Sequence, residues 1–240
     1  MHKDFILSNI SNITDEAFRA ISSLESNIAT FPLCEYILQT IFLRLTGYQE
    51  QKLKCILWEL ASSDFHFRYE YLRGNLKYGE CSSLKDKNSI YKKLVNVLDE
   101  KGCKFPILTD DEKKRQLSDI RAYFDEKFGN SLFVKWLPRD YSRFLDFSQR
   151  IELNFYFTKE KIFEDNNILK ETYENTYDHR NRCAHNLLCY QKNTPSLDLL
   201  MKDKNGSENY FSRMFILFLI DNVFTTLFQQ YCKVTRKIWD

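Results

Sequence analysis

The segment Arg180-Asn181-Arg182-Cys183-Ala184-His185 holds the side chains of this sequence best suited to chemistry. Two of the four histidines, at positions 179 and 185, lie in or beside it. An imidazole, with an ordinary pKa of about 6.5, can move protons near neutral pH. A guanidinium such as that of Arg180 can donate two parallel hydrogen bonds to a phosphate, which a lysine cannot. The segment is therefore suited to proton transfer beside a phosphate group.

The spacing within the segment indicates that a second copy is needed. Asn181 lies four residues before His185, on the same helix face, where its amide could hold the imidazole or the phosphate. Arg180 and His185, however, lie about 140° apart around a helix with about 100° per residue. One helix cannot aim both at one phosphate, and the chain contains a single copy. We therefore expect a homodimer in which two copies meet across a two-fold axis.

Further polar residues near the motif have two interpretations each. Arg182 and Lys192 could contact phosphates of a ligand or decorate the surface, and Tyr177 could stack on a ligand ring or fill the helix seam. Glu174, Asp178 and His179 could orient the motif or form a solvated helix face. We keep all six as candidates for orienting the site or binding its ligand.

The same region also allows a zinc interpretation, which geometry disfavours. His179 with Cys183, and His185 with Cys189, are both four residues apart. The two pairs project about 240° apart around the helix, so they cannot close one tetrahedral site. We predict no metal and no cofactor.

The pattern Arg180-Asn181-x-x-x-His185 resembles the arginine, four to six residues, histidine signature of the HEPN superfamily. The resemblance covers six of 240 residues. It implies an all-α bundle, usually dimeric, with a composite RNA-cleaving site that needs no metal. In such enzymes the 2'-hydroxyl of the RNA attacks the adjacent phosphorus and leaves 2',3'-cyclic phosphate and 5'-hydroxyl ends.

The resemblance also implies a biological setting. A toxin or antiviral defence effector that cleaves tRNA or another structured RNA is expected, with an antitoxin or other regulatory partner. Leu187 stands where one toxin subgroup carries the Tyr that its antitoxin modifies, which argues against that particular partner. The alternative is a non-catalytic HEPN-like helical module that binds RNA, nucleotide or protein. A third hypothesis is a helical toxin or scaffold acting through its aromatic-rich amino-terminal half.

Composition favours an all-α fold. Hydrophobic residues make up 43% of the chain, while Gly (six) and Pro (four) are too few for the frequent turns of a sandwich or barrel. The net charge of +2 argues neither for nor against a polyanionic partner. Seven cysteines without a CxxC pair suit reduced thiols, so we expect a cytoplasmic protein. We also expect no secretion leader, because only a brief apolar stretch precedes Ser8 and Asn9. We expect no membrane span, because the apolar window Met214 to Ile220 is short.

Apolar periodicity and capping residues predict the helices. Residues 1–104 are expected to form an amino-terminal helical part that is either separate from the core or continuous with it. Within this part we expect helices from Thr14 to before Thr30, from Phe31 to Gly47, from Gln49 onward, and from Ser89 to Glu100. The stretch up to Arg73 is open between helix and strand, and Asn75 to Asn88 is expected to be a loop. In residues 105–240, a HEPN-like four-helix core, we expect helices from the capping box at Thr109 to Phe128, from Pro138 to Thr158, from Ile168 to Tyr190 and from Ser207 to Ile238. A loop, Gln191 to Gly206, is expected to separate the last two.

Overall fold

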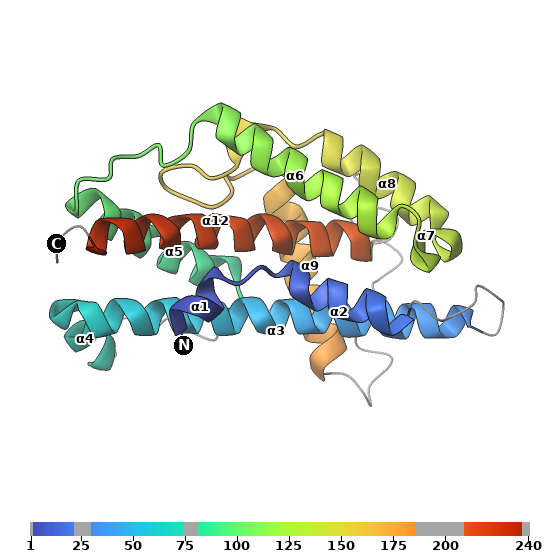
Figure 1. Cartoon of the computed structure of the whole chain (residues 1–240), viewed down its shortest axis with the longest axis horizontal. Coiled ribbons are helices and arrows are strands. Elements are labelled where there is room, and N and C mark those ends of the chain that lie inside the picture. Colours follow the sequence, from blue (N-terminus) through green and yellow to red (C-terminus); the bar gives the residue numbers. More distant parts are fainter. Residues whose placement is uncertain (1, 22–29, 74–80, 186–208, 237–240) are drawn as a thin grey trace.

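The computed structural model describes residues 2–21, 30–73, 81–185 and 209–236, without the side chains of residues 31, 32, 185 and 236 (Figure 1). The elements named in this part of the chain are all helical, which confirms the predicted all-α class. They are α1 His2–Leu7, α2 Ser11–Ile21, α3 Phe31–Ser63, α4 Phe65–Leu72, α5 Leu84–Glu100, α6 Asp110–Phe128, α7 Leu132–Trp136, α8 Pro138–Gln149, η1 Leu153–Phe155, α9 Ile168–His185 and α12 Tyr210–Arg236.

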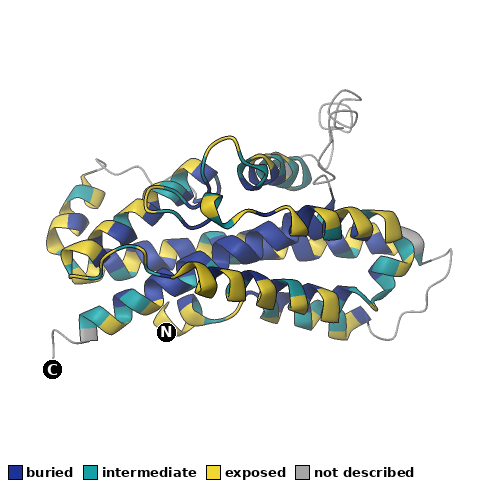
Figure 2. Ribbon diagram, turned by 90° about the horizontal axis from the view of Figure 1, so that it is seen from above, coloured by how far each residue is buried: buried dark blue, intermediate teal, exposed yellow. Residues whose placement is uncertain are grey.

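Helix α12 forms the centre of the molecule. It packs against α3, α5, α6, α8 and α9, and Figure 2 shows the buried residues gathered along the middle of the bundle. Its residues from Met214 to Ile220 are each at most 5% exposed, as predicted for a buried helix. The helix has the length and the mean hydropathy (1.5) to cross a membrane, but 89% of its most apolar window is buried inside the protein. Its apolar side chains thus form the core.

Helix α3 corrects the predicted break at Gly47. It continues to Ser63, and a Cβ built at Gly47 would meet no atom within 4 Å. A glycine inside a helix costs only about 0.5–1 kcal/mol. Burial of Leu45 before it, and of Leu53 and Ile56 after it, outweighs that cost because one straight helix keeps all three on the core side.

Two further helices of the amino-terminal part differ from expectation. Helix α2 begins at Ser11 rather than Thr14 and is preceded by the unpredicted α1; residues 22–29 lie outside the description. The stretch left open between helix and strand is the helix α4, capped where the Asp64 carboxylate accepts from the Phe67 N–H at 3.0 Å.

Helix α5 also begins earlier than predicted, inside the expected loop Asn75 to Asn88, of which residues 75–80 lie outside the described ranges. The Ser83 hydroxyl accepts from the Asp86 N–H at 3.1 Å and caps the helix start. Leu84 and Lys87 are buried in its first turn. The start of α5 is therefore packed against the protein, although the sequence around it is polar.

The predicted capping box at Thr109 is confirmed. The Thr109 hydroxyl accepts from the Glu112 N–H at 3.3 Å, while the Glu112 carboxylate accepts from the Thr109 N–H at 2.7 Å. Helix α6 then runs to Phe128, as predicted.

The helix expected from Pro138 to Thr158 starts as predicted but ends at Gln149 as α8. The chain then reverses, and an antiparallel bridge joins Tyr156 to Phe163. This reversal buries Tyr156, Phe157 and Phe163 almost completely, and the Tyr156 hydroxyl donates to the Leu219 carbonyl at 3.2 Å. In a continued helix the adjacent rings of Tyr156 and Phe157 would point about 100° apart, so one face could not bury both of them.

Helix α9 crosses α3 and α12 steeply, and its carboxyl-terminal end passes beyond α3 (Figure 1). Helices α1 and α2 lie on the other face of the α3 and α12 pair. The buried hydrophobic side chains of both predicted parts, residues 1–104 and 105–240, belong to one cluster. The candidate motif therefore lies on a helix held by elements from both parts.

Candidate functional site

Helix α9 is anchored by its first three turns. The Asn167 side chain accepts from the Leu169 N–H at 2.8 Å at the helix start. Thr172, Tyr173 and Thr176 are buried, and the Tyr173 hydroxyl donates to the Ser82 carbonyl at 2.6 Å. The buried face of these turns fixes the rotation of the last turns, which carry the motif.

Arg180 is held on two sides. Its Nη2 lies 3.0 Å from Oε1 of Glu50 on α3, and its Nη1 donates to the Asn181 side-chain oxygen at 3.1 Å. The Arg180 and Glu50 side chains are only 17% and 13% exposed. The two residues that the sequence places first in the motif are thus joined to each other, with the guanidinium in one orientation.

A cavity of about 10 Å³ adjoins this ion pair, enough for about one water molecule. Its lining includes Arg180, Glu50, Tyr177, Tyr173 and Lys87. The Lys87 ammonium is buried and donates to the Cys81 carbonyl at 2.8 Å. Burial lowers the pKa of Lys87 to about 8, against the opposing effect of Glu50. Glu50 therefore stabilises two cations, Lys87 and its ion-pair partner Arg180.

His179 faces a different part of the interior. Its Nε2 lies 3.2 Å from the Tyr210 hydroxyl and 3.5 Å from the Cys183 sulfur, and its ring contacts that of Phe42 with centroids 5.4 Å apart. Burial lowers the pKa of His179 to about 3, with further lowering by Arg213 and Arg182. This imidazole is neutral at physiological pH and packs α9 against α3 and α12.

The remaining candidates divide between exposed, half-buried and undescribed positions. Glu174 and Asp178 are exposed, and Glu174 lies 3.8 Å from Lys170. Tyr177 and Arg182 are half-buried. His185 is the last residue of α9; its side chain, the whole of Lys192 and the expected loop Gln191 to Gly206 lie outside the described residues. The structure thus brings Arg180, Asn181 and Tyr177 together and turns His179 away.

Positive charge gathers at the carboxyl-terminal end of α9. Arg180 and Arg182 lie in its last turns, and the guanidinium of Arg213 on α12 is close enough to lower the pKa of both His179 and Cys183. Cationic side chains at a helix carboxyl terminus interact favourably with the helix dipole. Arg213 is buried, so Arg180, which is 17% exposed, and the half-buried Arg182 are the cations that a phosphate could approach.

Glu50 and Lys87 are the residues that the sequence did not reveal. They lie 130 and 93 residues from Arg180, on helices whose polar positions look solvated in the sequence. A signal was present in α5, where Lys87 occupies the apolar face shared by Leu84, Tyr91 and Leu94. A lysine on such a face indicates a buried charge with a partner on another element.

Neither a metal-binding cluster among the described residues nor a known relative points to a function. In the described ranges, no three His, Cys, Asp or Glu side chains gather closely enough to hold a metal ion. No family model, curated protein or solved structure matches this chain. The motif and the geometry around it are therefore the basis for assigning a function.

Proposed function

We propose that this protein is a metal-independent RNA endonuclease of the HEPN type. Its substrate is tRNA or another structured RNA, and its products carry 2',3'-cyclic phosphate and 5'-hydroxyl ends. His185 exchanges protons with the attacking 2'-hydroxyl and the leaving oxygen, Arg180 stabilises the charge on the phosphate, and Asn181 positions it.

The observation that carries the proposal is the fixed guanidinium of Arg180. Glu50 holds Nη2 and Asn181 accepts from Nη1, so the side chain does not have to be ordered when a phosphate arrives. The group is 17% exposed and lies one helical turn and a half before the end of α9, where His185 stands. The half-buried Arg182 adds positive charge at that end.

The proposal includes a homodimer in the cytoplasm. The angle between Arg180 and His185 around α9 requires a second copy of the motif, and the end of α9 that passes beyond α3 suits contact with another subunit (Figure 1). As a toxin or defence effector the enzyme would be controlled by an antitoxin or other regulatory partner, without a membrane.

A second candidate function is a non-catalytic HEPN-like module that binds RNA, nucleotide or protein. The Arg180 and Glu50 ion pair favours it, because a largely buried salt bridge between α9 and α3 accounts for Arg180 without any phosphate. The two candidates differ in their requirement for His185.

The test is incubation of the purified protein with total tRNA in EDTA, followed by analysis of the RNA ends. We expect cleavage with cyclic-phosphate ends, reduced about 100-fold or more in His185→Ala and Asn181→Ala. The matched control is His66→Ala, since the His66 side chain on α4 is 80% exposed. Circular dichroism and sedimentation of each variant establish that the fold and the dimer persist.

Intact RNA with a folded wild-type dimer would exclude the nuclease and leave the binding module. Cleavage that His185→Ala retains would assign the activity to another site. A strict requirement for Mg²⁺ would indicate a different mechanism.

A further inference from the structure

A second polar site lies on the face of the α3 and α12 pair opposite to α9. It is a cavity of about 530 Å³ between the α1 to α2 connection, α6 and α12. Pockets of about 300–1,000 Å³ are the size that takes small-molecule ligands. No residue of the candidate nuclease motif lines it.

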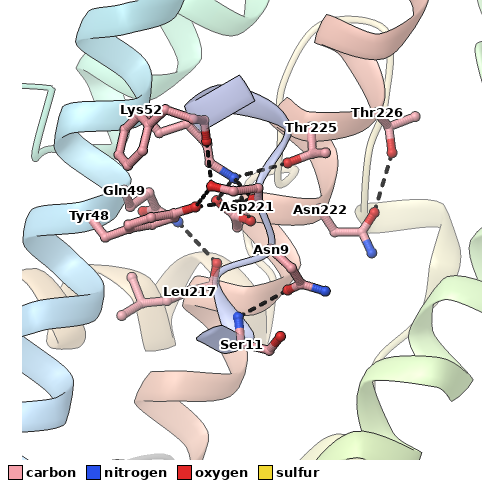
Figure 3. A network of polar contacts seen from close by, with 12 residues as sticks. Asn9, Ser11, Tyr48, Gln49, Lys52, Leu217, Asp221, Asn222, Thr225 and Thr226 are labelled. Atoms are coloured by element: carbon pink, nitrogen blue, oxygen red, sulfur yellow. Dashed lines mark hydrogen bonds and ion pairs between the residues drawn. The ribbon is translucent and has the colours of Figure 1, made fainter. Parts of the chain in front are cut away.

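Carboxamide side chains from three elements line this cavity. They are Asn9 from the α1 to α2 connection, Gln116 from α6, and Asn222 and Gln229 from α12. Carboxamides offer a donor and an acceptor side by side, which is the pattern of a nucleobase edge. Figure 3 shows Asn9 and Asn222 close to the buried Lys52 and Asp221 pair.

The hydrogen bonds already made leave a definite set of groups for a ligand. The Asn9 oxygen accepts from the Ser11 N–H at 3.0 Å, and the Asn222 oxygen accepts from the Thr226 hydroxyl at 3.3 Å. The Gln116 amide nitrogen donates to that same hydroxyl at 3.2 Å. The Gln116 oxygen is buried without a hydrogen-bond partner in the described structure. The amide nitrogens of Asn9 and Asn222, the amide oxygen of Gln116 and the exposed carboxamide of Gln229 thus remain to be matched.

The charges around the cavity exclude an anionic ligand. Its lining contains the carboxylates of Asp119 and Asp221 and no Lys, Arg or His. The nearest cation shown, Lys52 beneath Asp221, is 1% exposed and is used by Asp221 at 2.8 Å and by the Ser8 carbonyl at 2.9 Å. A phosphate would meet two carboxylates and no free cation.

The rest of the lining is apolar and partly flat. Leu7, Ile10 and Ile120 contribute aliphatic surface, and the rings of Tyr123 and Phe218 stack with centroids 5.4 Å apart at 27°. A planar, uncharged ligand would bury its faces against these groups while its edge meets the carboxamides.

We propose that this cavity binds a nucleobase, either in a free nucleoside or in an RNA strand whose phosphates stay outside. The chemistry of recognition is the same for both sources: an amide-lined edge, apolar contact with the ring, and no contact with phosphate. The inference does not depend on the ribonuclease activity, because it uses neither α9 nor its motif.

The test is calorimetric titration of the full chain with adenosine, guanosine, cytidine, uridine, their 5'-monophosphates and ribose. A short 2'-deoxy oligonucleotide, which the proposed nuclease cannot cleave, serves as the strand. We expect at least one nucleoside to bind at or below about 1 mM, with its monophosphate about tenfold weaker and ribose not binding.

Variants locate the site. We expect Asn222→Ala to weaken nucleoside binding about tenfold. Gln229→Ala, a change at an exposed side chain that folding tolerates, should weaken it several-fold. The matched control is Gln230→Ala, one residue further along α12 and not part of the lining.

Each outcome decides the proposal. Binding of nucleosides that the Asn222 and Gln229 variants weaken supports a free ligand; binding of the oligonucleotide alone, with the same sensitivity, supports a base within a nucleic-acid strand. No binding of either, binding unchanged in both variants, equally tight monophosphates, or ribose binding as well as nucleosides would each overturn it.

Discussion

At the scale of single residues, Arg180 has a structural partner as well as a proposed catalytic role. Its guanidinium and the Glu50 carboxylate are both largely buried, and removal of one leaves the other without a counterion. We therefore expect Glu50→Gln to lower the free energy of unfolding by about 1–3 kcal/mol, measured by urea denaturation.

The control for this prediction is Glu174→Gln on the same helix as Arg180. Glu174 is an exposed residue 3.8 Å from Lys170, so its loss should change stability by at most about 0.5 kcal/mol. Equal effects of the two substitutions would show that the Arg180 and Glu50 pair contributes no more than a surface contact.

His179 should make stability depend on pH. The pKa of His179 is about 3 in the folded protein, compared with the ordinary value of 6.5 that applies to the unfolded chain. Between these two values the unfolded chain binds a proton at His179 and the folded protein does not. The stabilisation is full above pH 6.5 and is lost progressively as the pH falls toward about 3. Urea midpoints measured across this window should fall more steeply for the wild type than for His179→Gln.

The matched substitution for the pH series is His66→Gln, whose exposed side chain lies on α4. Its midpoints should follow the wild-type slope. A His179→Gln slope identical to the wild type would contradict the assignment of this titration to His179.

At the scale of elements, α3 shows how packing overrides a local break signal. Gly47 lies inside the helix, and a Cβ there would meet nothing within 4 Å. We expect Gly47→Ala to raise the free energy of unfolding by about 0.5–1 kcal/mol, because alanine loses less backbone entropy in a helix. The melting temperature should rise by about 1–4 °C.

Gly129, where α6 ends, is the contrasting position. A Cβ there would lie 2.5 Å from the Asp125 carbonyl oxygen in the backbone, so Gly129→Ala should destabilise the protein. A Gly47→Ala variant less stable than the wild type would mean that α3 needs a bend at this residue.

At the scale of the whole molecule, Lys52 on α3 and Asp221 on α12 join two helices, although the two residues are 169 positions apart in the sequence. Burial lowers the pKa of Lys52 and raises that of Asp221, so each charge depends on the other. We expect Asp221→Asn to lower the free energy of unfolding by about 3–5 kcal/mol, since it leaves the Lys52 ammonium buried alone.

The double variant Lys52→Met with Asp221→Leu separates this pairing from simple loss of contacts. It should recover part of the stability lost by Asp221→Asn, because no uncompensated charge remains. If the stability losses of Lys52→Met alone and Asp221→Leu alone, measured by urea denaturation, add up to the loss of the double variant, the two residues are not coupled.

The sequence by itself determined the helical class, the capping box at Thr109, the start of α8 and the buried character of Met214 to Ile220. These features depend on periodicity and capping within about one or two helical turns, which neighbouring residues define. The candidate motif also belongs to this group, because its resemblance depends on spacing within one helix.

Only the tertiary structure decided the course of α3 through Gly47, the end of α8 at Gln149 and the partners of the charged residues. Each depends on free energy gained between segments far apart in the chain: burial of Tyr156 and Phe163, the Arg180 and Glu50 pair, and the Lys52 and Asp221 pair. The sequence lists both members of each pair but not their distance. Burial then sets the pKa of Lys87 and His179. The position of Lys87 on the apolar face of α5 indicates that it is buried, but not which residue is its partner.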